Sequence, residues 1–181
     1  PVFYSTKRLS ISGQNRNDWQ LKPLAAVEDE FTIIAIGDPQ CEVEKEANRF
    51  RDETLVDIRS TISSAQTNSN RYHNAYAITL GDVTFDNNAL WPTMAKLCSS
   101  IKLNNGKSIP VFNCIGNHDH NRKHSRNQKR AVEEFEAAFG VRNQWFELGE
   151  TLFLTFDNIE FRPNKTYGEG IDAEQLVWMS E

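Results

Sequence analysis

The chain has 181 residues, a length that fits one domain with a sizeable core. Its 39% hydrophobic and 25% charged content is ordinary for a folded globular protein and argues against disorder. The net charge of −5 argues against a nucleic-acid partner, because a general nucleic-acid-binding surface is basic. No apolar stretch reaches the roughly 18 residues of a membrane-spanning helix, so no membrane span is expected.

Residues 1–29 carry few signals and are interpreted as a lead-in or linker to a domain that covers residues 30–181. The cysteines are odd in number and lack the spacing of a zinc site. Cys98 and Cys114 are expected to be buried as small hydrophobes. Cys41 lies beside a cluster of polar residues, and a functional thiol there is the alternative to a buried one.

Three apolar runs, 31–36, 75–80 and 110–115, predict buried strands because they are rich in β-branched and aromatic residues. Helical periodicity over 47–67 and 88–101 separates them, which indicates an α/β fold with a parallel sheet. Parallel strands end at one edge of a sheet, where ligands bind. The polar residues that follow the three strands are therefore expected to converge: Asp38, Gln40, Asp82, Asp86, Asn117, His118 and Asp119.

The remaining elements follow the third polar cluster. An apolar helix face is predicted within 131–139, and a hairpin with a two-residue turn joins 144–148 to 151–156. Asp172 and Gln175 have the spacing of a capping box, which predicts a helix start there.

The converging residue types indicate a metal site. Crowded carboxylates repel one another unless a cation lies among them. Asp, Asn, Gln and His side chains are competent ligands for Mg, Mn, Fe or Zn, and two bridged metals can activate water and polarise a phosphate. The competing interpretation is that Gly, Asp and Asn occur here only as turn residues. Repetition after three successive strands favours the metal site.

The motifs Asp38-x-Gln40, Gly81-Asp82-x-x-x-Asp86 and Gly116-Asn117-His118-Asp119 resemble those of the calcineurin-like metallophosphoesterase family, over about residues 31–181. The resemblance implies a layered α/β-β/α sandwich with two mixed sheets. It also implies two divalent metal ions (Mn, Fe, Zn or Mg). By resemblance, Asp38 and Gln40 would bind the first metal, and Asp82 would bridge both metals. Asn117 would bind the second metal. His118 would contact the phosphate or protonate the leaving oxygen, and Asp119 would orient His118.

Two departures from the family pattern stand out. Gln40 stands where the family usually has histidine, and its side chain is a weaker ligand for Zn or Fe than imidazole is. The Asp-Pro-Gln sequence at 38–40 resembles one branch of the family, which forms the central domain of a three-part bacterial architecture. The family also has later histidines, whereas His120 and His124 come too early to match them. The domain is therefore predicted to be incomplete at its C-terminus, weakly active or inactive, and able to self-associate through uncovered sheet surface.

A basic stretch, residues 120–130, follows the third cluster. It is interpreted either as a solvated loop and helix start or as a segment that attracts anionic substrate groups. His120 and Arg122 are candidate substrate contacts, with an exposed, idle side chain as the alternative for His120. Asp86 is a further candidate contact near the site, but it is not expected to be a metal ligand.

The resemblance implies a hydrolase that cleaves a phosphate monoester or diester with a metal-bound hydroxide. Its substrate would be a phosphorylated small molecule or a glycan-type compound. A non-catalytic domain that binds a ligand or partner on the same fold is the alternative, favoured by Gln40. The related architecture implies a periplasmic or secreted location, with a cytoplasmic location as the alternative.

Overall fold

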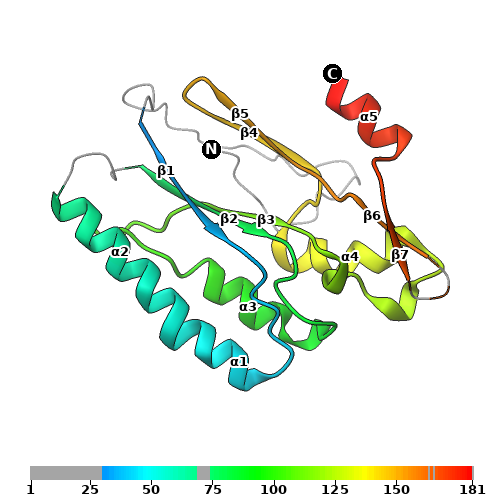
Figure 1. Ribbon diagram of the computed structural model, residues 1–181, viewed down its shortest axis with the longest axis horizontal. Coiled ribbons are helices and arrows are strands. Elements are labelled where there is room, and N and C mark those ends of the chain that lie inside the picture. Colours follow the sequence, from blue (N-terminus) through cyan, green and yellow to red (C-terminus); the bar gives the residue numbers. More distant parts are fainter. Residues whose placement is uncertain (1–29, 69–73, 163, 165, 181) are drawn as a thin grey trace, which may run out of the picture.

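The computed structural model describes residues 30–68, 74–162, 164 and 166–180, and the lead-in predicted for 1–29 lies outside them. Strands and helices alternate along the first part of the chain in an α/β arrangement, as the hydrophobic periodicity predicts (Figure 1). A parallel sheet has the strand order β1-β2-β3. Its strands are β1 (Thr32–Ile36), β2 (Ala75–Leu80) and β3 (Val111–Cys114).

The position of a strand in this sheet decides how deeply it is buried. The central strand β2 is buried along all but its last residue, Leu80. The prediction of a buried strand is wrong for β1, where Ile36 alone is buried and Ala35 is exposed. Among the described residues, β1 has a paired neighbour on one side only, and the alternation of apolar residues does not reveal which strand lies at the edge.

Helices cover one face of the sheet (Figure 1). One helical run extends from Glu44 to Asn68, so it begins three residues before the predicted start, and it contains a π-helical turn at Phe50–Thr54. Pro92 lies in the first turn of the next helix, where a missing N–H costs nothing. The helices are α1 (Glu44–Arg49), α2 (Leu55–Asn68), α3 (Trp91–Cys98), α4 (Gln128–Phe139) and α5 (Ala173–Ser180).

The opposite face of the sheet is covered by the predicted hairpin of β4 (Gln144–Leu148) and β5 (Thr151–Thr155), which pair antiparallel (Figure 1). The described residues form two hydrophobic cores, and neighbouring residues of β2 pack into different ones. Ala77 packs among the helices, whereas Ile78 packs with Phe112 and Phe146 under the hairpin. The aromatic rings of Phe112 and Phe146 stack with centroids 3.5 Å apart.

A second antiparallel pair, β6 (Ile159–Phe161) and β7 (Tyr167–Glu169), leads to α5. The predicted capping box is confirmed, because the backbone N–H of Gln175 donates to Asp172 Oδ1 at 2.7 Å and that of Asp172 donates to Gln175 Oε1 at 2.9 Å. Across the described residues, none of the helices combines the length and apolarity that crossing a membrane requires.

Candidate functional site

Main-chain hydrogen bonds join the three loops that follow β1, β2 and β3. The N–H of Gln40 donates to the carbonyl of Asp82 at 2.8 Å, and the N–H of Phe85 donates to the carbonyl of Cys41 at 3.1 Å. The third loop is attached to the second, because the N–H of Asp86 donates to the carbonyl of His118 at 3.3 Å. The convergence predicted at this edge of the sheet is therefore present for these loops.

Four non-glycine residues in the first two loops adopt left-handed backbone conformations. Their φ angles are 38° at Asp38, 44° at Gln40, 47° at Asp82 and 55° at Asp86, and no other described non-glycine residue has a positive φ. Each costs free energy and persists only where the surrounding structure imposes it, as at binding and catalytic sites. All four are residues that the sequence analysis assigned to the site.

Gly116 allows the second and third loops to approach each other. Its φ of −109° suits any residue, so backbone conformation does not require glycine here. A Cβ at this position would instead overlap the carboxylate and backbone nitrogen of Asp82. The residue before the Asn117-His118-Asp119 turn is therefore glycine because Asp82 occupies the space.

Replacing Gly116 by alanine is expected to lower the free energy of unfolding by about 1–3 kcal/mol, since the loops must separate to admit the methyl group. Urea denaturation measures the effect. Gly170 is the control, because a Cβ there meets no atom within 4 Å, and its alanine variant should stay within about 0.5 kcal/mol of wild type. Equal stability of the two variants would contradict the close approach.

His118 is held from two sides. Its ring Nδ1 lies 3.1 Å from Asp86 Oδ1, and Phe85 stacks on the ring with centroids 4.0 Å apart. Arg122 Nε forms an ion pair with the same Asp86 oxygen at 3.0 Å. Phe85 was not among the predicted residues, although its place directly before Asp86 in the second polar cluster was a signal. The structure therefore brings His118, Asp86 and Arg122 together.

Asp119 does not orient His118, contrary to the expectation from the resemblance. It is fully buried, and its oxygens accept hydrogen bonds from the backbone N–H groups of Val83, Thr84 and Gly116 at 3.1–3.2 Å. Burial raises the pKa of Asp119 to about 6, against the opposing effect of these N–H donors. Asp119 thus fastens the second loop to the third, and the carboxylate beside the histidine ring is that of Asp86.

The four residues that the resemblance implies as metal ligands could coordinate a metal only through oxygen atoms: Asp38, Gln40, Asp82 and Asn117. Asp82 Oδ1 accepts the N–H of His118 at 2.9 Å, and Gln40 Nε2 donates to Asp82 Oδ2 at 3.4 Å. Asp38 and Gln40 are exposed, and Asn117 is half-buried on its turn. Among the described residues, no three His, Cys, Asp or Glu side chains gather as a metal cluster, and the implied set has only two carboxylates beside two amides. Carboxylate and amide oxygens fit Mg²⁺ or Mn²⁺.

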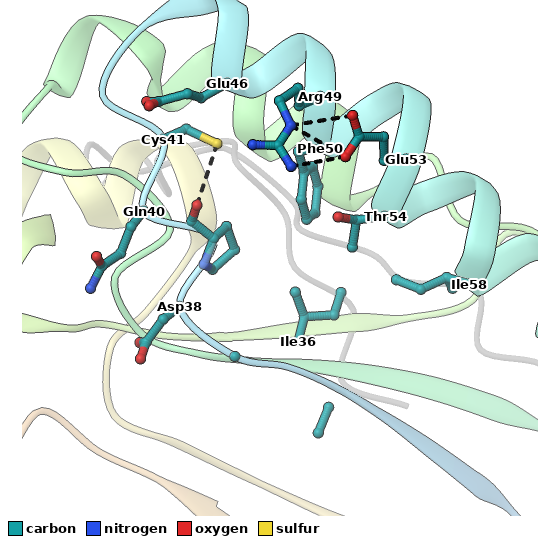
Figure 2. A pocket seen from close by; sticks show the side chains of 13 residues that line it. Ile36, Asp38, Gln40, Cys41, Glu46, Arg49, Phe50, Glu53, Thr54 and Ile58 are labelled. Carbon is teal, nitrogen blue, oxygen red and sulfur yellow. Dashed lines mark hydrogen bonds and ion pairs between the residues drawn. The ribbon is translucent and has the colours of Figure 1, made fainter.

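A cavity of about 450 Å³ lies between the first loop and the helical run. Figure 2 shows Asp38 and Gln40 extending from the loop away from the helix that bears Phe50.

Cys41 is buried on the side of the loop that faces the helix, where its Sγ donates to the carbonyl of Pro39 at 3.7 Å. Burial, and to a smaller extent the charge of Glu46, raises the pKa of Cys41 to about 11, which argues against a functional thiolate. Cys98 is buried as predicted, whereas Cys114 is half-buried.

His120 is buried, so its prediction as a substrate contact or as an exposed, idle side chain is wrong. Its ring Nε2 lies 3.2 Å from Asp157 Oδ2, within a side-chain pair that is 0% exposed. Arg142 Nη1 donates to the same Asp157 oxygen at 2.8 Å. Neither Asp157 nor Arg142 was predicted, since a single carboxylate after a strand is no signal for such a pairing.

The contacts of Asp157 with His120 and Arg142 lead us to expect a loss of stability in acid. Burial acts to raise the pKa of Asp157, but His120, the N–H of Ile159 and Arg142 outweigh it and hold the pKa below the ordinary 3.8. The ionised group therefore stabilises the fold above about pH 4, and this contribution disappears as the pH falls through the folded-state pKa. Between about pH 5 and pH 3, wild type should lose more unfolding free energy in urea than Asp157→Asn does. Parallel losses would contradict the assignment.

Compared with protein-family models, the chain matches none, and no curated protein matches it either.

Proposed function

We propose that this chain is a metal-dependent phosphoesterase of the calcineurin-like type, which hydrolyses a phosphate monoester or diester. The observation that supports the proposal best is the group formed by His118, Asp86 and Arg122 beside the Asp82 carboxylate. These residues come from loops after adjacent parallel strands, at the edge where ligands of α/β proteins bind.

The histidine has the surroundings of a general acid. A carboxylate only accepts, so Nδ1 of His118 donates to Asp86, and Nε2 is the nitrogen that would protonate the leaving oxygen. The Asp86 carboxylate stabilises the protonated ring that this step requires. Arg122, 37% exposed, would attract the phosphate to the same place.

Two divalent metal ions, when bound, would polarise the phosphate and activate water. Asp38, Gln40, Asp82 and Asn117 are the residues that would hold them. Because all four offer oxygen, we expect Mg²⁺ or Mn²⁺ rather than Zn²⁺ or Fe. The substrate would be a phosphorylated small molecule or a glycan phosphate.

The layered sandwich of the resembled family belongs to this proposal as well. The hairpin of β4 and β5 packs over the sheet face opposite the helices, through Phe146 and Leu148. That is the position from which a second sheet would extend. A crystal structure of the protein with neighbouring strands added to this hairpin would support it.

The experiment is hydrolysis of p-nitrophenyl phosphate and bis-p-nitrophenyl phosphate with added Mn²⁺, beside calorimetric titration of Mn²⁺. The Asp82→Asn variant should lose both activity and metal binding; asparagine tolerates the left-handed backbone at this position, so the fold is kept. Asp57→Asn, an exposed change on α2, is the matched control. Absence of hydrolysis and of metal binding in wild type would overturn the proposal.

One observation favours a non-catalytic binding domain as the second candidate. Both oxygens of Asp82 are engaged by protein donors, one of them the Gln40 amide. A site satisfied internally has less need of a cation. Binding of phosphate compounds without turnover, unaffected by Mn²⁺, would establish this alternative.

A further inference from the structure

A buried histidine connects the candidate site to the C-terminal part of the described chain. His120 is 0% exposed, and its Nδ1 lies 2.9 Å from the carbonyl oxygen of Gly116, the residue directly before the turn that carries His118. A carbonyl only accepts, so Nδ1 carries a proton. The contact attaches the start of this turn to a side chain at its end.

The second ring nitrogen also faces an acceptor. Nε2 lies 3.2 Å from Asp157 Oδ2 and 3.4 Å from the Gln128 amide nitrogen, whose own donation goes to the carbonyl of Ile159 at 2.8 Å. Asp157 accepts from Arg142 and from the N–H of Ile159, so it acts as a carboxylate. Asp157 and Gln128 thus hold the Nε2 side of the ring, while Nδ1 faces Gly116.

Asp157 is in turn held by segments far along the chain. Its carbonyl accepts from the Gln175 side chain on α5 at 2.5 Å, and its N–H donates to Asn143 at 3.0 Å. Gln175 also donates to Asn143 at 3.1 Å. The Nε2 side of the ring is therefore held from α4, α5 and the loop before β4, which all lie outside the three loops of the site.

We propose that His120 is a positioning residue, which fixes the Gly116 carbonyl through Nδ1 while Asp157 anchors its Nε2, and which thereby holds the turn that presents His118. The proposal rests on the proposed function for its effect on hydrolysis. A displaced turn would move His118 away from Asp86, and a shift of about 1 Å at such a position costs up to about 100-fold in rate.

Two variants of His120 test the contacts of its two ring nitrogens one at a time. The side-chain nitrogen of asparagine takes the place of Nδ1, whereas that of glutamine takes the place of Nε2. His120→Asn should keep the Gly116 contact and the His118 ring signals in a long-range ¹H–¹⁵N spectrum. His120→Gln should shift those signals and lower kcat about 10- to 100-fold with little change in KM. His124→Asn, on the next turn, is the control.

The outcomes are distinguishable. A purely structural role would lower the melting temperature and the activity of both His120 variants in parallel, which would overturn the proposal, as would unshifted His118 signals in His120→Gln. If wild type hydrolyses nothing, the proposed function fails while the His118 spectrum still tests the positioning. The wild-type spectrum needs no variant: a proton on His120 Nδ1 supports the contact with the Gly116 carbonyl, and a bare Nδ1 overturns it.

Discussion

Hydrolysis of a phosphoester by the His118→Ala variant should be about 10²- to 10⁴-fold slower than by wild type at saturating Mn²⁺, the size of effect typical of a general acid. The loss should appear in kcat, because under the proposed function the ring would act on the leaving oxygen and the substitution leaves the proposed metal ligands untouched. Asp86→Asn should lower kcat by less, since the amide still orients the ring but no longer stabilises its protonated form. Steady-state kinetics with p-nitrophenyl phosphate measures both.

His124→Ala is the matched control for His118→Ala. His124 lies on the turn at Arg122–His124, in the same basic stretch, and is half-buried like His118. Its removal should leave kcat within about twofold of wild type, as expected for a substitution that removes none of the proposed site contacts. If His118→Ala retained the activity of this control, His118 would not be the acid, and the group with Asp86 and Arg122 would have another role.

Phe146→Ala should lower the free energy of unfolding by about 3–5 kcal/mol, the usual cost of emptying a buried aromatic site. Phe146 is 2% exposed and stacks on Phe112 of the sheet at 3.5 Å and on Phe153 of its own hairpin at 4.9 Å. Its removal would leave a cavity between the hairpin and the parallel sheet. Urea denaturation followed by circular dichroism measures the change.

Trp145→Ala is the control on the same strand. Trp145 points to the other face of the hairpin and is 54% exposed, so its loss should cost less than about 1 kcal/mol. A comparable loss in both variants would show that the outer face of the hairpin is also covered in solution. That result would agree with the self-association expected through uncovered sheet surface.

The elements with strong periodicity were predictable from the sequence, because their patterns reflect local geometry. The parallel strands, the helix after β1 and the hairpin around Gly149 each have their own apolar repeat or turn residues. The edge position of β1 was not predictable, since lateral neighbours depend on contacts far along the chain. The π-helical turn at Phe50–Thr54 likewise has no local signature.

At the site, the sequence predicted which loops meet, because parallel strands must end at one edge of the sheet. It did not predict the partners within them: the resemblance paired His118 with Asp119, yet the ring meets Asp86 while Asp119 bonds to backbone N–H groups. Four non-glycines of these loops have left-handed backbones, and although Asp tolerates this conformation, the sequence does not reveal which residues adopt it.

The sequence by itself determined the class of the fold, the order of its strands along the chain and the identity of the polar clusters, since each depends on residues near one another in the chain. Tertiary structure alone decided the roles of Asp86, Asp119 and His120. Each role depends on a partner: Asp86 meets His118 and Asp119 meets Val83, in both cases more than 30 residues away in the chain. His120 shows this most clearly: its position in a basic stretch favours solvent, but the fold places it against Gly116 and Asp157. Burial and partner choice are properties of packing, and packing is settled only when the distant segments meet.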